Sequence, residues 1–360
     1  MRYPEFLKKE GTIGCIAPSF GCTTEPYRTA FLAAQTEFKV KGYQVVLGPN
    51  CYESKGIGKS NTPEACGEEI NAFFERKDVD IILVCGGGET MCEDLDYVDF
   101  KLLKKEKPKW FMGLSDNTNL TFLLPTLCDT ASIYGPCAPS FGMRPWHKSI
   151  DDAWKLLHGK KLGFDGYGLW EAESIKSEEN PLEPYHVTEP SALTTWHYNK
   201  KQKWVQTQEK VKMEGRLLGG CLDCLINLAG TRYDRVRQFN KKYEKDGILW
   251  FLEACDLNPI AIRRAMWQLE HAGWFENAKG FIIGRPKCGS PVIGPPAGGA
   301  EPMMGMDAHQ AVLEVVKGHH VPVVLDFDLG HLPPQIPFIT GALGRLEVEG
   351  NHSHLEFRLK

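Results

Sequence analysis

Short apolar runs alternate with longer amphipathic segments over roughly the first 135 residues, and this alternation constrains the fold more than any other feature. Between the runs, apolar residues recur at helical spacing over 25–42 and again after Thr62-Pro63, a pair typical of a helix start. Such alternation is typical of a layered α/β domain with a mostly parallel sheet. The runs with the length and composition of strands are 12–18, 43–47, 80–85 and 110–112.

A second series of strand-like and helical segments fills the C-terminal part of the chain. We expect a layered N-terminal α/β domain at 1–164 and a smaller, β-rich α/β C-terminal domain at 213–360. Residues 165–212 show no sustained periodicity and are rich in Glu, Pro, Tyr and Trp, so we expect a linker or lid there. The expected C-terminal strands are 215–219, 247–252, 280–284, 321–327, 338–341, 344–349 and 354–359, with helices at 222–228, 259–272 and 307–316.

Composition excludes several functional classes. The net charge of -4 argues against a nucleic-acid or anionic membrane partner, and no apolar run approaches the roughly 18–20 residues of a membrane span. Twelve cysteines without a signal-peptide pattern predict reduced thiols in a cytoplasmic protein. Cys221 and Cys224 have CxxC spacing, but no second pair completes a zinc site, so we expect them to line a buried helix and predict no metal or cofactor.

The stretch from Lys109 to Leu120 predicts a strand, a sharp turn and a helix, with Ser115 on the turn. A serine at the carboxyl end of a strand, followed by the amides of a helix start, suits a nucleophile whose oxyanion forms beside its own backbone. The alternative is structural: Ser115 or Asp116 could be an ordinary helix N-cap.

Glu253 and His331 also follow apolar strands. A serine needs a base, histidine has a suitable pKa, and a carboxylate can fix the histidine tautomer, so Ser115, Glu253 and His331 form the minimum set for acyl transfer. Alternatives remain: Glu253 could be a solvated turn residue and His331 a loop residue. The nearest competing histidines are His309, His319 and His320.

Three glycines, Gly86 to Gly88, end the apolar run at 80–85. They could form a tight turn that needs positive φ, or they could bring a backbone amide to a substrate oxyanion. A dinucleotide site is disfavoured because the GxGxxG spacing is missing. A thiol nucleophile at Cys85 is disfavoured too, since Cys85 lies within the apolar strand and is expected to pack as core.

Several ordered motifs resemble the serine peptidase family of LD-carboxypeptidases and microcin C self-immunity proteins, and the resemblance covers essentially the whole chain. These motifs are TIGCIAPS, VCGGGETMCEDLDYVDF, FMGLSDNTNL, GRLLGGCLDCLINLAGTRYD, ILWFLEACD, GFIIGRP and DFDLGHLPPQIPFITGA. The extra glycine and Glu89 in the glycine turn, and the long loop from Cys288 to Gly305, depart from the family pattern.

The resemblance implies a catalytic triad of Ser115, Glu253 and His331. It also implies an oxyanion hole made by the amides of Gly87 and Asp116, a site between two domains, and a homodimer. The lid-like segment DGYGLWEAESIKSEENPLEPY, at 165–185, is similar to the microcin-immunity branch, in which a loop aromatic packs on a nucleobase. Trp170 and Trp196 are the two candidates for that substrate contact.

We therefore expect a serine carboxypeptidase-like hydrolase that cleaves an amide near the C-terminus of a short peptide or peptide–nucleotide conjugate. The alternative substrate is a murein tetrapeptide, cleaved at its L,D bond. A rival of another class is a non-catalytic peptide-binding protein on the same fold.

Overall fold

A six-stranded sheet organises the first of two compact units into which the chain divides. The computed structural model describes residues 1–287 and 305–360, so the predicted loop from Cys288 to Gly305 lies outside the described residues except for Gly305. The first unit comprises Met1–Leu162, Ser174–Tyr185 and Pro337–Gly341. The second comprises Gly163–Glu173, His186–Ile336 and Ala342–Lys360.

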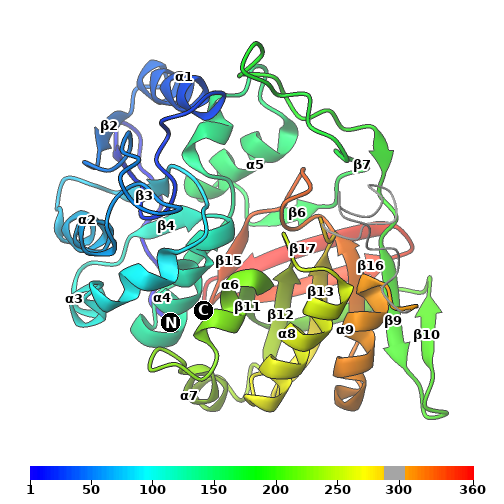
Figure 1. Ribbon diagram of the computed structural model, residues 1–360. Coiled ribbons are helices and arrows are strands. Elements are labelled where there is room, and N and C mark those ends of the chain that lie inside the picture. The colour runs from blue at the N-terminus through cyan, green and yellow to red at the C-terminus, as the bar shows by residue number, and fades with distance from the viewer. Residues whose placement is uncertain (288–304) are drawn as a thin grey trace. The chain divides into compact units, whose positions relative to one another are not determined.

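The sheet of the first unit has the strand order β15-β5-β4-β3-β1-β2. The neighbouring strands β5, β4, β3, β1 and β2 all pair in parallel, and only β15 is antiparallel to its neighbour β5. The predicted parallel α/β layer is therefore confirmed (Figure 1). Its strands are β1 (Thr12–Ile16), β2 (Gln44–Leu47), β3 (Ile81–Val84), β4 (Trp110–Gly113), β5 (Ser132–Tyr134) and β15 (Phe338–Thr340).

The helices of this unit follow its strands in chain order. Helix α2 begins as the sequence predicts, because the Thr62 hydroxyl accepts a hydrogen bond from the Ala65 amide and Pro63 occupies the first helical position. The helices are α1 (Tyr27–Val40), α2 (Pro63–Glu75), α3 (Phe100–Lys105), α4 (Thr118–Cys128) and α5 (Lys148–Leu157), with 3₁₀ turns η1 (Met91–Asp96), η2 (Ser115–Asn117) and η3 (Ala138–Gly142).

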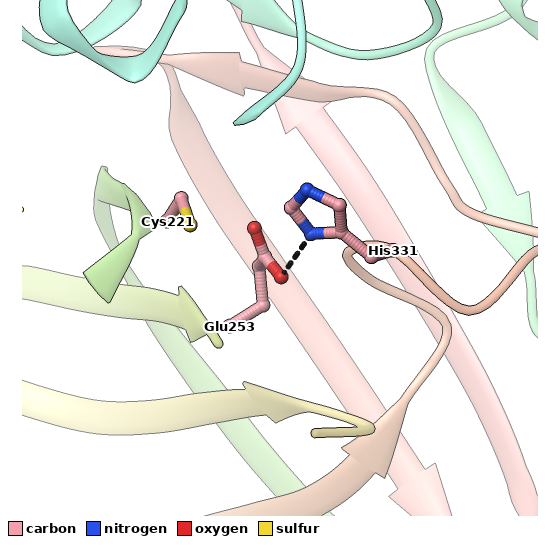
Figure 2. Close-up of side chains that lie close together, drawn as sticks. All are labelled: Cys221, Glu253 and His331. Atoms are coloured by element: carbon pink, nitrogen blue, oxygen red, sulfur yellow. Dashed lines mark hydrogen bonds and ion pairs between the residues drawn. The ribbon is translucent and has the colours of Figure 1, made fainter. Parts of the chain in front are cut away.

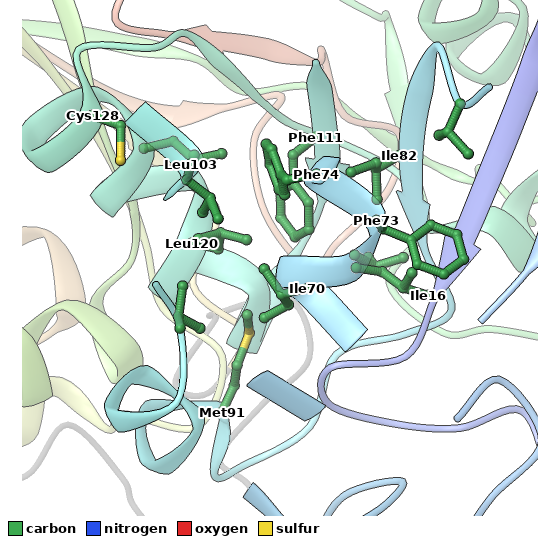
Figure 3. Close-up of a cluster of buried hydrophobic side chains, with 14 residues drawn as sticks. Ile16, Ile70, Phe73, Phe74, Ile82, Met91, Leu103, Phe111, Leu120 and Cys128 are labelled. Atoms are coloured by element: carbon green, nitrogen blue, oxygen red, sulfur yellow. The ribbon is translucent and has the colours of Figure 1, made fainter. Parts of the chain in front are cut away.

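One apolar cluster connects helices α2 and α4 to the strands of this sheet (Figure 3). Ile70 and Phe74 of α2, Leu120 of α4 and Phe111 of β4 are fully or almost fully buried in it. The burial of these side chains fixes where β4 ends relative to α4, and that junction carries Ser115.

The second unit is built on a nine-stranded sheet with the order β10-β9-β14-β13-β12-β11-β16-β17-β6. Its centre, β11 to β14, is parallel, and the flanking strands are antiparallel. Its strands are β6 (Gly163–Asp165), β7 (Leu169–Trp170), β8 (Glu189–Pro190), β9 (Thr194–Tyr198), β10 (Trp204–Thr207), β11 (Val211–Cys221), β12 (Ile248–Glu253), β13 (Ala278–Gly284), β14 (Val323–Phe327), β16 (Leu343–Glu349) and β17 (His352–Arg358), where β7 and β8 pair separately.

Helices α8 and α9 pack against each other in this unit (Figure 1). The apolar face predicted for α8 is confirmed, since Ile262, Ala265, Met266 and Leu269 are buried. The helices are α6 (Leu222–Leu228), α7 (Val236–Lys242), α8 (Pro259–His271) and α9 (Ala308–Val316), with the 3₁₀ turn η4 (Lys317–His319).

The structure corrects two expectations about organisation. The stretch 165–212 is not free of regular structure: it contains β7 to β10, β9 pairs with β14 in the large sheet, and the stretch is divided between the two units. The C-terminal unit is β-rich as predicted, but it is not the smaller one, because its ranges are about as long as those of the first unit and it carries the larger sheet.

Among the helices of the described ranges, none combines the length and apolar character needed to cross a bilayer.

Candidate active site

Ser115 occupies a sharp turn between β4 and α4, as the sequence predicts. Its φ is +65°, in the left-handed region that a non-glycine residue adopts at a cost of about 1–3 kcal/mol. The turn is held by a hydrogen bond that the Ser115 amide donates to the Tyr134 hydroxyl, at 3.2 Å. Tyr134 ends β5, the neighbouring parallel strand. A strained serine at the carboxyl end of a strand has the conformation of a nucleophile on a strand-to-helix turn.

The glycine turn after β3 lies against Ser115. A Cβ added to Gly87 would lie 2.8 Å from the Ser115 Cβ and 3.1 Å from its Oγ, so only glycine fits at this position. The Gly87 carbonyl accepts a hydrogen bond from the Phe20 amide at 2.8 Å, which fixes the peptide plane of the turn. The glycines therefore bring bare backbone close to Ser115, an arrangement that is compatible with an oxyanion hole.

The alternative of an N-cap at Ser115 or Asp116 is wrong, because both residues lie within η2, whose N-cap position is Leu114. No side-chain cap is present on η2 or α4. The buried Asp116 carboxylate instead accepts hydrogen bonds from the Ser19 hydroxyl (2.6 Å) and the Met91 amide (2.9 Å). The Asn117 side chain donates to the Gly86 carbonyl at 2.8 Å. Both side chains hold the backbone around the nucleophile.

A buried network that sequence reasoning missed continues from Asp116. Lys59 donates to Asp94 at 2.5 Å and to the Thr90 carbonyl at 2.7 Å. Burial raises the pKa of Asp94 to about 7, although the hydrogen bond and the charge of Lys59 act to lower it. Burial likewise raises the pKa of Asp116. Ser19 ends the TIGCIAPS run and Lys59 lies in a polar loop. Only their contacts show that they support the segment around the glycine turn.

Glu253 and His331 form a hydrogen-bonded pair in the second unit (Figure 2). The distance from His331 Nδ1 to Glu253 Oε2 is 2.8 Å. Glu253 ends β12 and is 1% exposed, so the alternative of a solvated turn residue is wrong. His331 lies in the loop after β14, and its side chain is 14% exposed. The histidine is therefore oriented by a carboxylate that is withdrawn from water.

Gly330 allows this pairing. Its φ is +101°, and a Cβ there would lie 2.6 Å from Glu253 Oε2. Any side chain at this position would displace the carboxylate, and this clash explains why a glycine precedes His331.

The carboxylate also changes the ionisation of the histidine. Burial alone would lower the pKa of His331, but the charge of Glu253 and the hydrogen bonds that the ring makes to Cys255 and Glu253 raise it well above its usual value. A raised pKa makes the ring a stronger base, in keeping with a residue that must take a proton from a serine.

The competing histidines have partners of their own. His309 contacts Asp326 at 3.0 Å, and His319 contacts Glu270 at 2.7 Å. His320 has a left-handed backbone and its ring lies 5.6 Å from that of Tyr198. Cys85 is buried in the core as expected, and burial raises the pKa of its thiol well above the ordinary range, which disfavours a thiolate nucleophile.

The two tryptophans proposed for substrate contact lie in different surroundings. Trp170 is 4% exposed, its indole N–H donates to the Pro190 carbonyl, and the Arg285 guanidinium lies 5.3 Å from its ring. Little of the Trp170 ring is therefore accessible to a planar ligand in this structure. Trp196 is half-buried within strand β9, so it lies on the sheet rather than on a lid.

Comparisons with known proteins agree with the fold. Residues 13–135 match the model of the LD-carboxypeptidase N-terminal domain, and residues 214–346 match that of the C-terminal domain. A Vibrio cholerae protein with a provisional carboxypeptidase name is 25% identical over 99% of this chain and 98% of its own. The microcin C7 self-immunity protein MccF of Escherichia coli is 24% identical over 92% of this chain and 88% of its own.

Solved structures show the same fold at lower identity. MccF in complex with aspartyl sulfamoyl adenosine superposes with a TM-score of 0.77 at 21% identity, covering 100% of this chain and 99% of that one. An MccF-like protein from Bacillus anthracis gives a TM-score of 0.78 at 20% identity, covering 99% of this chain and 100% of the other. The two matched domain models together cover more than half of the residues, and the chain belongs to the LD-carboxypeptidase family.

Proposed function

We propose that this protein is a serine hydrolase in which Ser115, Glu253 and His331 act as a catalytic triad. The observation that carries the proposal is the buried Glu253–His331 pair, because a histidine oriented by a withdrawn carboxylate is the base that a serine nucleophile requires. The strained turn at Ser115 supports it from the other unit. Family membership supports a carboxypeptidase type of reaction.

In this mechanism the Ser115 hydroxyl attacks an amide carbonyl carbon, and His331 Nε2 takes the serine proton. The carbonyl electrons move to oxygen, and the amides of Gly87 and Asp116 stabilise that oxyanion. His331 then gives its proton to the departing amine, which leaves an acyl-serine. Water, deprotonated by the same ring, releases the acid and restores Ser115. Glu253 stabilises the imidazolium in both steps and is not itself protonated.

For the substrate we propose a short peptide or peptide–nucleotide conjugate that is cleaved at an amide near its carboxyl end. Solved MccF structures are described as complexes with aspartyl sulfamoyl adenosine and with glutamyl sulfamoyl guanosine, and their fold extends over nearly the whole of this chain. The second candidate is the L,D amide of a murein tetrapeptide, supported by the LD-carboxypeptidase description of both matched domains.

The test is hydrolysis of both substrate classes by the wild type, Ser115→Ala and Ser54→Ala, with products identified by mass spectrometry. Ser115→Ala should lower turnover by on the order of 10⁶-fold. The exposed Ser54 is a matched control in the same unit, and its replacement should leave turnover unchanged. Near-ultraviolet circular dichroism would check that both variants are folded.

The same experiment tests the alternative that the protein binds its ligand without hydrolysing it. Such a protein would bind an aminoacyl sulfamoyl nucleoside without releasing product, and Ser115 would not be labelled by a fluorophosphonate probe. Wild-type turnover in Ser115→Ala would overturn the triad assignment.

A further inference from the structure

A cysteine thiol lies beside the Glu253–His331 pair. One donor atom each from Cys221, Glu253 and His331 lies within 4.8 Å of the other two. Figure 2 shows the Glu253 carboxylate between the Cys221 thiol and the His331 ring. Neither the proposed reaction nor the hydrogen bonding of the pair needs a thiol there.

The sheet itself determines this placement. Cys221 ends β11 and Glu253 ends β12, and the two are direct partners in the parallel register of these neighbouring strands. Partners in register present their side chains on the same face of a sheet. Gly330 lies so close to Glu253 that a Cβ there would clash with the carboxylate. Its neighbour His331 is thereby held at the same end of the sheet. The three donors are thus held by elements far apart in sequence.

Sulfur, imidazole nitrogen and carboxylate oxygen are together the ligands that zinc prefers. Zinc sites with three protein ligands and one open position are common, and tetrahedral sulfur and nitrogen ligands lie roughly 3.6 Å apart. The thiol would need to approach the other two donors by about 1 Å, and the His331–Glu253 pair, now at 2.8 Å, would need to open by a smaller amount; rotation of the side chains provides movements of this size. The partly exposed ring of His331 gives an ion a way in, since Cys221 and Glu253 are each only 1% exposed.

We propose that Cys221, Glu253 and His331 bind a thiophilic divalent cation such as Zn²⁺, and that this ion switches off the hydrolase. The inhibitory part rests on the function proposed above, whereas the binding part does not. The ion is a reversible inhibitor here and takes no part in catalysis.

The inhibition follows from proton balance. In the metal-free pair, Nδ1–H of His331 donates to Glu253 and Nε2 is the basic nitrogen. When the ion takes the Nδ1 lone pair, the ring proton moves to Nε2, and the Cys221 thiol releases its proton to solvent. The ring stays neutral, but Nε2 now carries hydrogen and cannot accept the proton of a serine. The carboxylate is at the same time turned from the ring to the metal.

Cys224 provides a matched control. It forms the CxxC pair with Cys221 and hydrogen-bonds it, but within the described part of the chain it is not a member of the three-donor group. If the CxxC pair alone bound the metal, Cys221→Ser and Cys224→Ser would weaken binding alike. If the strand-end group binds it, Cys221→Ser should weaken binding far more.

The experiment is a Co²⁺ titration of the full-length, reduced, tag-free protein, followed by Zn²⁺ competition and by hydrolysis rates with and without chelator. We expect a thiolate-to-cobalt absorption band in the wild type and in Cys224→Ser. In Cys221→Ser we expect loss of that band and at least about tenfold weaker binding. Zn²⁺ should inhibit the wild type reversibly, and inhibition of each variant is compared with its own metal-free rate.

Absence of the cobalt band in the wild type, or an equal loss of affinity in the two serine variants, would overturn the proposed site. Tight binding without any change in hydrolysis would overturn the inhibition alone. If the protein hydrolyses neither substrate class without metal, the proposed function fails while the cobalt result still decides the site.

Discussion

Glu253 acts on His331 through charge as well as orientation, and the two effects can be separated by pH. Its carboxylate favours the imidazolium, so Glu253→Gln should lower the pKa of His331. In the proposed mechanism the neutral ring is the base, so the rising limb of kcat/KM should move to lower pH. The plateau rate should fall by on the order of 10³- to 10⁴-fold, since the oriented tautomer is lost.

A suitable control is Glu270→Gln, which removes the carboxylate that contacts His319. It makes the same chemical change next to a histidine for which we propose no catalytic role. Its pH–rate profile should match that of the wild type. A rising limb in Glu253→Gln that stays in place or moves to higher pH would contradict the assignment of His331 as the base.

Substitutions at Gly330 and Gly42 distinguish two effects of an added side chain, namely backbone strain and displacement of the Glu253 carboxylate. Gly330→Ala and Gly42→Ala both place a side chain at positive φ, +101° and +90°, and each should cost about 1 kcal/mol of stability for that reason. Only at Gly330 would the new Cβ meet Glu253, whereas nothing lies within 4 Å of one at Gly42. Activity should fall strongly in the first variant alone, as measured by turnover and thermal melting of both proteins.

At the scale of elements, helix α6 holds the turn that follows β12. The Asp223 carboxylate accepts hydrogen bonds from the amides of Cys255 and Asp256, each at 3.0 Å. Asp223→Ala leaves both amides without this acceptor and should lower the free energy of unfolding by about 1–3 kcal/mol. Asp223→Asn keeps one acceptor oxygen, so its denaturation midpoint should lie between those of the wild type and the alanine variant. Equal midpoints for all three proteins would contradict this role.

Most strands and helices could be predicted from sequence, but the short strands within 165–212 could not. Helix α6 has the predicted bounds of Leu222 to Leu228, α8 ends one residue before its predicted end, and β12 begins and ends one residue later than predicted. Strands β7 to β10 were missed because strands of two to five residues show too little alternation. Helix α7 was missed as well; its seven residues are mostly polar.

At the scale of the whole molecule, each unit is assembled from separate pieces of chain. Strand β15, at 338–340, completes the sheet of the first unit by pairing with β5, although most of that unit ends at residue 162. Phe338 and Ile339 are fully buried there. A fragment of residues 1–162 should therefore lose at least the roughly 3–5 kcal/mol typical of deleting one buried phenylalanine side chain.

The control fragment carries residues 337–341 on a flexible linker after residue 162. Restoring the strand should raise the denaturation midpoint and sharpen the transition, as followed by circular dichroism in urea. If both fragments unfold at the same midpoint, β15 contributes nothing to the stability of this unit.

The sequence by itself determined much of the local structure: most of the longer strands and helices, that Ser115 lies on a turn, and that Glu253 and His331 follow strands. These properties depend on neighbours a few residues apart, which a sequence displays directly. The tertiary structure alone decided which distant groups meet. It paired Glu253 with His331 and placed the Cys221 thiol near that pair. It also gave the Asp116 carboxylate a hydrogen bond from the Ser19 hydroxyl in place of a helix-capping role. Such contacts depend on strand order and register, which short-range patterns do not encode.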